Sequence, residues 1–510
     1  GDRQLIKNVQ SSKGRDINKT PLMQKKNKQF VPSGDSQGYQ FGTFKGVFMP
    51  SILTILGVIM FLRLGWVLGH IGLAGTLIIV TVATSVTFLT GLSLSMLSAN
   101  SRVGRGGAYY IISRSLGLEV GGAIGLPLYA AQALGIAFYI AGFAEAVATV
   151  FPALDPRLVG VVTLAVLATL AYVSADLALR VQFIVLACIF AALISFFSGT
   201  PLAPSELPAV PVQSTVTFWA AFAIFFPAVT GIEAGLAMSG DLKNPSKSLP
   251  LGTISAVVVG YLVYMAIPLF FTWLVPDTDI LRNDTMAMRL VARWKPLIVL
   301  GVWAATLSSA MGALLGAPRT LQALAKDRVL PHFIGRGFGS GGDPRIATAI
   351  TFGIALAGIL GGGLNVIAPI LSMFFLASYA LINASAGLEE WVHPPSWRPT
   401  FRVHYVASLA GGLFCLAVML MINAGATIVA IAVLSVAYYL MKRRRLRTSW
   451  GDARYGIMML ILRSILLKLD KMKVEERTWK PNILVCSGAP TKRWYLIQLA
   501  HALAQRNSFV

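Results

Sequence analysis

The feature that most constrains this chain is a series of long apolar stretches, which recurs from about residue 47 to residue 441. Each stretch is close to the ~20 residues that an α-helix needs to cross the hydrocarbon core of a bilayer. Because lipid offers the backbone no hydrogen bonds, such stretches have to be helices that pair their own N–H and C=O groups. The composition agrees, since only 13% of the residues are charged, which is about half the share in soluble domains.

Hydropathy therefore predicts an all-α membrane protein with twelve transmembrane helices. The predicted spans are residues 47–71, 73–98, 119–150, 157–176, 180–199, 214–240, 250–275, 293–324, 347–363, 365–388, 401–423 and 424–441. Three regions follow from this: a disordered basic tail at 1–40, a transmembrane domain at 41–445, and a C-terminal region at 446–510. The last region is predicted to hold a linker helix and the beginning of a cytoplasmic α/β domain, with a strand at 482–486 and a helix at 492–505.

The positive charge follows the sidedness of a membrane protein. The net charge is +22, and much of it lies in the tail between Lys7 and Lys28 and in the run from Lys442 to Arg447. Loops on that side are rich in Lys and Arg, whereas the 200–213 loop on the other side has neither. This bias predicts a multi-pass protein of the plasma membrane with both termini cytoplasmic, and it argues against nucleic acid as a partner.

Motifs of enzymes and of metal centres are missing from the sequence. It contains no P-loop, ATPase motif or catalytic-triad spacing. The three cysteines, Cys188, Cys415 and Cys486, have neither metal-binding nor disulfide spacing. We therefore expect no enzyme activity, no cofactor and no metal beyond alkali cations.

Two spans carry helix-disfavouring residues near mid-membrane. The first has Gly57, and the sixth has Pro227 and Gly231. Interrupted hydrophobic segments at matching places in two halves point to the binding site of a transporter, although glycine in a membrane helix also serves close packing. The spacing favours the first interpretation, because Tyr139 follows Gly57 by 82 residues and Ser308 follows Gly231 by 77.

These positions predict a repeat of five plus five spans, with the halves at about 47–199 and 214–388 and two further helices at 401–441. Since five is odd, the halves would insert with opposite orientation. A helix break exposes N–H groups that suit an anion and carbonyls that suit a cation. A site made of backbone dipoles and hydroxyls fits small ions better than a bulky organic substrate.

The motifs around these breaks resemble the cation–chloride cotransporters, within the amino acid–polyamine–organocation superfamily. The resemblance covers nearly all of 40–445, and the short external loops are similar to those of a prokaryotic member. Its motifs are Gly57-Val-Ile-Met-Phe-Leu-Arg-Leu, Gly106-Gly-Ala-Tyr-Tyr through Gly117, Phe222-Ala-Ile-Phe-Phe-Pro-Ala-Val-Thr-Gly231, Ser239-Gly-Asp241, Ala305-Thr-Leu-Ser-Ser309 with Gly316-Ala-Pro318, and Asn365-Val-Ile-Ala-Pro through Asn383. It implies the LeuT-type fold, with helices 1 and 6 broken, in a homodimer.

The resemblance also implies an ion site for each transported species. Potassium would be held by Thr54, the Ile55 carbonyl, Tyr139, the Pro227 carbonyl and Thr230. Sodium would be held by the carbonyls of Leu53, Leu56 and Ala305 and the hydroxyls of Ser308 and Ser309. One chloride would bind the N–H groups of Gly57, Val58 and Ile59, and a second those of Gly231, Ile232 and Glu233 with the Tyr379 hydroxyl. The paired serines favour symport of sodium, potassium and chloride by alternating access.

Two departures from the family pattern keep alternatives open. Thr54 stands where the family usually has Asn, and Glu233 stands where an apolar residue is usual. An ionised Glu233 would repel chloride unless it points away, is neutral, or replaces that anion. The alternatives are a sodium-independent potassium–chloride symporter and an amino-acid or polyamine permease on the same fold. A non-transporting sensor is a third hypothesis, which the ion-site hydroxyls disfavour.

Charged residues at the ends of the pathway are candidate gates. Arg63 and Glu145 lie inside predicted spans, where charges are costly and are paired or functional. The resemblance implies that they pair across the external vestibule, and the alternative is a static salt bridge. Lys45 resembles an internal gate position, or it is a lysine that extends along lipid to reach the interface.

Overall fold

The computed structural model describes residues 41–100, 107–173, 175–202, 216–237, 242–275, 278–283, 286–338, 343–393, 397–443, 458, 462–468, 485 and 494–504. In this part of the chain the protein is helical, and its β-structure consists of two isolated bridges, Phe41 with Leu242 and Phe338 with Asp343. The expected strand at 482–486 lies outside the described residues except for one position. The expected helix that follows it is present as α19 (Trp494–Ala504).

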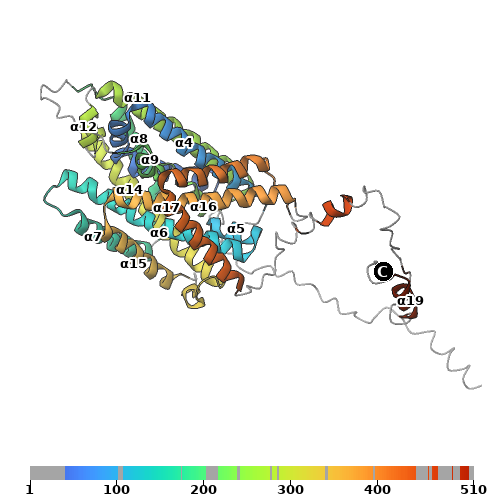
Figure 1. Cartoon of the computed structure of the whole chain (residues 1–510). Coiled ribbons are helices and arrows are strands. Elements are labelled where there is room, and N and C mark those ends of the chain that lie inside the picture. Colours follow the sequence, from blue (N-terminus) through green and yellow to red (C-terminus); the bar gives the residue numbers. More distant parts are fainter. Residues whose placement is uncertain are drawn as a thin grey trace, which may run out of the picture. The chain divides into compact units, whose positions relative to one another are not determined.

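The first half of the chain forms the elements from η1 to α8 (Figure 1). They are the π-helix η1 (Phe44–Phe48), α2 (Met49–Ile55), α3 (Val58–Leu62), α4 (Leu64–Asn100), α5 (Gly107–Leu116), α6 (Leu118–Val150), α7 (Pro156–Val173) and α8 (Ala175–Phe197). Within α4, Gly72 is non-helical at φ 77°. It divides this element at the boundary that hydropathy predicts between the first two spans.

The second half forms the elements from α9 to α17. They are α9 (Phe218–Phe225), η2 (Phe226–Ala228), α10 (Ile232–Ala237), α11 (Pro245–Leu274), α12 (Thr278–Asn283), α13 (Ala287–Val291), α14 (Lys295–Lys326), η4 (His332–Gly335), α15 (Arg345–Gly361), α16 (Leu364–Val392) and α17 (Tyr405–Arg443). Asn423 interrupts α17 with non-helical φ and ψ. The short helices α12 and α13 fall in the 276–292 region, which the sequence analysis treats as a loop.

Among the described residues, eight helical segments are long and apolar enough to cross a membrane. Three shorter apolar helices accompany them, at Pro156–Ala171, Val181–Phe197 and Arg345–Gly361. The two segments with breaks are the most buried of the eight. In their apolar 18-residue windows, 83% of Phe44–Leu62 and 78% of Phe218–Leu236 is buried, against at most 61% in the other six. The broken helices therefore form the centre, and the continuous helices surround them.

The surrounding helices contact the breaks directly. The α2 segment packs against α8, α10, α11 and α14, and α3 packs against α6, α14 and η2. Glycine permits one of these approaches, because a Cβ on Gly142 of α6 would lie 2.1 Å from Cγ2 of Val58 in α3. The α6 and α14 helices, which carry Tyr139 and Ser308, thus lie against the breaks.

A polar cluster fastens α5 to the end of α14. The Tyr109 hydroxyl donates to Oδ2 of Asp327 at 3.0 Å, and Arg114 forms an ion pair with the same carboxylate at 3.3 Å. Burial raises the pKa of Tyr109 well above its usual value, so its hydroxyl stays a donor at neutral pH. These contacts give Tyr109 a structural role.

Candidate ion-binding site

The two helix breaks meet at the centre of the protein. At the first, Leu56 leaves helical geometry with ψ 49°, and Gly57 is extended at φ −96°, ψ −151°. At the second, Gly231 has φ 120°, a backbone conformation that favours glycine. A Cβ on Gly231 would lie 2.7 Å from Cγ2 of Thr54. Glycine is therefore required here both by its own backbone angle and by the closeness of the first break.

The predicted potassium ligands gather around this contact. The Thr230 hydroxyl donates to the Pro227 carbonyl at 2.8 Å. The Thr54 hydroxyl donates to the carbonyl of Pro50 at 2.9 Å. A hydroxyl that donates its proton to the backbone still has lone pairs on its oxygen. Both threonine oxygens therefore keep the capacity to accept a cation.

A tyrosine occupies one lone pair of the Ile55 carbonyl. The hydroxyl of Tyr264 in α11 donates to this oxygen at 2.7 Å. A carbonyl oxygen has two lone pairs, so one is left for a cation. Tyr139 lies nearby, because its phenol interacts electrostatically with Tyr264 and with Glu233. The structure thus brings Tyr139 to the breaks and adds Tyr264 to the site.

The predicted sodium ligands come from the end of α2 and from α14, which pack against each other. The last carbonyls of a helix have no partner within it, and Leu53 and Leu56 belong to this end. On α14, Ala305 is fully buried and Ser308 is half-buried. The hydroxyl of Ser309 is buried and makes no hydrogen bond to any described residue. Leaving a buried hydroxyl unpaired costs about 1–3 kcal/mol, so a ligand at Ser309 would remove that penalty.

The predicted chloride donors lie at the two breaks as well. Gly57, Val58 and Ile59 open the short helix α3, and all three are buried. At the other break, the fully buried Tyr379 hydroxyl lies beside the backbone N–H of Gly231 and the carboxyl of Glu233. It has no hydrogen-bond partner within the described residues. Ile232, the first residue of α10, is also fully buried.

Glu233 points into this site and not away from it. Its side chain is buried, and Nε2 of Gln132 in α6 donates to its Oε2 at 3.3 Å. Its Oε1 has no partner among the described residues. The phenols of Tyr139 and Tyr379 both interact electrostatically with it. Of the three possibilities that the sequence left for Glu233, only a neutral carboxyl or a replacement of the anion fits this geometry.

The candidate gate residues Arg63 and Glu145 form a bidentate ion pair. Nη1 and Nη2 of Arg63 each lie 2.8 Å from a carboxylate oxygen of Glu145. Nε of the same guanidinium donates to Oδ1 of Asn365 in α16, also at 2.8 Å. The arginine side chain is 5% exposed and the glutamate 25%. One buried cation thus joins the first break to α6 and α16.

Lys45 lies apart from this pair. It is exposed in η1, and its Nζ lies 5.3 Å from the ring centroid of Phe183. This contact is a cation–π interaction. Lys45 therefore rests on an aromatic ring of α8.

Three residues of the site escaped the sequence analysis: Gln132, Tyr264 and Asn365. Gln132 stands seven residues before Tyr139 on α6, which is two helical turns and hence the same face. A polar residue on the face of a predicted ligand is a signal that could have identified it. Tyr264 and Asn365 lie 209 and 302 residues from their partners, and nothing local in the sequence pairs them.

Comparisons with known proteins agree with this architecture. The model of the amino acid permease family matches residues 46–485. The chain is 34% identical to solute carrier family 12 member 2 of Danio rerio over 533 aligned residues, which cover 91% of this chain and 47% of that protein. The human protein of the same name gives 34% identity, with 92% of this chain and 44% of that protein covered.

The name of a third relative states which ions it transports. The bumetanide-sensitive sodium-(potassium)-chloride cotransporter of Manduca sexta is 33% identical over 539 residues, 93% of this chain and 51% of that protein. The chain spans about half the length of the curated relatives it matches. These relatives are named as solute carriers and as a cotransporter, and they confirm the resemblance of this chain to the cation–chloride cotransporters. By its match over residues 46–485, this chain belongs to the amino acid permease family.

Proposed function

We propose that this protein is a secondary-active symporter that couples the movement of sodium, potassium and chloride by alternating access. The observation that carries the proposal is the contact between Thr54 and Gly231, which joins two helix breaks in the buried centre. Carbonyl and hydroxyl oxygens are the hard ligands that alkali cations prefer, and N–H groups at helix starts suit chloride. The relatives support this cargo through the name of the Manduca sexta cotransporter.

The ions take the positions that the resemblance implies. Potassium binds between Thr54, Ile55, Tyr139, Pro227 and Thr230, and sodium binds between Leu53, Leu56, Ala305, Ser308 and Ser309. One chloride binds at Gly57, Val58 and Ile59, and the second binds at Gly231, Ile232 and Tyr379 while Glu233 is neutral. The unpaired hydroxyls of Ser309 and Tyr379 support the sodium site and the second chloride site. No cofactor is needed, because ion gradients drive the cycle.

The proposed architecture has twelve spans in a five-plus-five inverted repeat. It is supported by the eight long apolar segments, the three shorter apolar helices and the interruption of α17 at Asn423. In this arrangement both termini are cytoplasmic, residues 1–40 form a tail, and residues 446–510 begin a cytoplasmic domain. The protein works as a homodimer in the plasma membrane.

The ion pair of Arg63 and Glu145 acts as the external gate in this proposal. It is supported by the position of Arg63 directly after α3, where one movement of that short helix would separate the charges. Lys45, in η1 just before the first span, acts at the internal end.

A second candidate function is an amino-acid or polyamine permease, and Glu233 favours it. A chloride about 4 Å from an ionised carboxylate would be destabilised by about 4 kcal/mol at an effective dielectric constant of 20. A cationic amine would instead be attracted by the same charge. Symport of potassium and chloride without sodium is the third possibility, and it would leave Ser308 and Ser309 as packing residues.

Rubidium uptake into proteoliposomes separates these functions. With the full chain, we expect uptake of ⁸⁶Rb⁺ that falls to background when either sodium or chloride is replaced by an impermeant ion. Protein-free vesicles give the background. Uptake that is indifferent to chloride would rule out the proposed symport, and uptake that needs chloride without sodium would establish potassium–chloride symport.

The paired serines should set the sodium dependence. In Ser308→Ala/Ser309→Ala, we expect loss of sodium-stimulated uptake, because both hydroxyl ligands are removed while the helix is kept. Ser255→Ala is the matched control, since its hydroxyl is exposed on α11 and donates to the carbonyl of Leu251. It should retain sodium dependence. Persistent stimulation by sodium in the double variant would contradict the assigned site.

Glu233 distinguishes a chloride carrier from a carrier of organic cations. We expect Glu233→Gln to retain chloride-dependent rubidium uptake, because the amide cannot repel chloride and remains within reach of Gln132. Gln132→Ala, which removes the partner and keeps the acid, is the comparison. Two results together would contradict the proposal. The Glu233→Gln variant would lose all chloride-dependent rubidium uptake, and the wild-type protein would transport a radiolabelled amine.

The gate pair should be coupled in transport as well as in contact. Neutralising one partner leaves a buried charge uncompensated, so Arg63→Gln and Glu145→Gln should each lower rubidium uptake strongly. The double variant should lose less than the sum of the two in a double-mutant cycle. The control is the ion pair of Arg282 and Asp279, whose Nη1 and Oδ1 atoms lie 2.6 Å apart. These two residues are three positions apart in the sequence. If the fraction of uptake that the double variant retains equals the product of the fractions retained by the two single variants, the pair has no gating role.

A further inference from the structure

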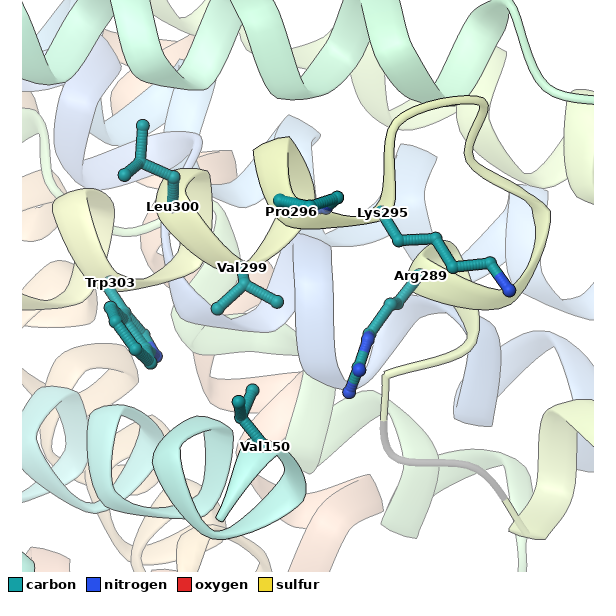
Figure 2. Close-up of a pocket in the computed structure, with 7 residues that line it drawn as sticks. All are labelled: Val150, Arg289, Lys295, Pro296, Val299, Leu300 and Trp303. Carbon is teal, nitrogen blue, oxygen red and sulfur yellow. The ribbon is translucent and has the colours of Figure 1, made fainter.

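A cavity of about 300 Å³ lies away from the helix breaks, where α6, α13 and α14 come together (Figure 2). It is lined by Val150, the last residue of α6, by Arg289 of α13, and by residues of the first turns of α14. None of the proposed ion ligands lines it. The volume is at the lower end of the range for small-ligand pockets, so the cavity can hold a head group with its nearest atoms.

Two cations border this cavity without a matching anion. Arg289 reaches toward α6, and the side chain of Lys295, at the start of α14, points away from the guanidinium (Figure 2). Among the residues that the structure describes, neither forms an ion pair with a carboxylate. Within these residues, the Arg289 side chain has one hydrogen bond, from Nη1 to the carbonyl of Thr149 at 3.5 Å, which is long for a hydrogen bond. Most of the five guanidinium donors therefore remain available to a ligand.

The rest of the lining is apolar. Val299 and Trp303 lie about one and two turns along α14 from Lys295 (Figure 2). Leu300 is 48% exposed and Trp294, the residue before Lys295, is 49% exposed, so the helices that the structure describes leave this side of α14 uncovered. Aromatic and basic residues at the end of a span are typical of the bilayer interface.

Trp303 contributes an aromatic ring to the apolar part of the lining. Its indole nitrogen is buried and has no hydrogen-bond partner within the described residues. A ligand that fits this lining carries a negative charge at one end and an apolar chain beyond it. A free inorganic anion would leave the apolar wall uncovered, and an uncharged lipid would leave both cations unpaired.

We propose that this cavity binds the head group of an anionic phospholipid from the surrounding bilayer. The phosphate lies between Arg289 and Lys295, and the start of the acyl chain lies along Val299, Leu300 and the ring of Trp303. The lipid joins the end of α6 to the start of α14. Because those helices carry Tyr139 and Ser309, the bound lipid steadies the frame of the ion site. The binding itself does not depend on which ions are transported.

Quenching of Trp303 by brominated lipid tests this site. The full chain is placed in phosphatidylcholine vesicles with increasing amounts of brominated phosphatidylglycerol, and the fluorescence of Trp303→Phe is subtracted to isolate Trp303. We expect half-maximal quenching at a low fraction of anionic lipid. Arg289→Gln and Lys295→Gln should each raise that fraction about fivefold, and the double variant about twentyfold.

Two control variants test whether the change in quenching arises at this cavity. Arg157→Gln/Lys247→Gln removes the same charge from exposed positions and should leave the titration unchanged. Arg289→Lys/Lys295→Arg preserves the charge and should bind as the wild type does, which guards against loss of fold. Three results would each overturn the proposal. Brominated phosphatidylcholine could quench as strongly as brominated phosphatidylglycerol, or the control variant could shift the titration as much as the Arg289 and Lys295 double variant. The third is displacement of the lipid by inorganic phosphate.

Discussion

The contact between Thr54 and Gly231 is the constraint on which the rest of the structure depends. It joins two segments that have given up regular helix in the most buried part of the protein. Inside a bilayer, unpaired backbone groups are tolerated only where protein encloses them or where they line a polar cavity. The breaks therefore require a shell of continuous helices, and α6, α8, α11 and α14 supply it. The long helices surround the broken segments because the unpaired backbone groups of those segments cannot be exposed to lipid.

Some buried polar groups of the described residues are paired and others are not, and several unpaired ones lie at the helix breaks. Asn383 is completely paired, since it donates to Thr90 at 2.8 Å and accepts from Ser93 at 2.7 Å. This network holds α16 against α4. By contrast, the hydroxyls of Ser309 and Tyr379 and one oxygen of Glu233 have no partner within the described residues. Under the proposed function, these open oxygens are the positions where a transported ion would supply the missing contact.

Much of the fold could be predicted from the sequence because the bilayer imposes one length and one secondary structure. The break residues Gly57 and Gly231 were also predictable, since glycine and proline have local conformational effects. The span boundary expected at Asn423 coincides with a break in α17. Contacts without a local signal were not predicted: the hydrogen bonds from Tyr264 to the Ile55 carbonyl and from Arg63 to Asn365 join distant parts of the chain. Such pairings are set by tertiary packing, on which apolar periodicity carries no information.

Glu233 connects the two kinds of ion site through its charge. It lies within electrostatic reach of Tyr139, a proposed potassium ligand, and of Tyr379, a proposed chloride ligand. An ionised carboxylate would strengthen a cation at the first and weaken an anion at the second, and a protonated one would do neither. Gln132 can support both forms, because its amide donates to the carboxylate and its free oxygen can accept from the acid. In the proposed symporter, the protonation of this one side chain would therefore set the balance between cation and anion binding where the two breaks meet.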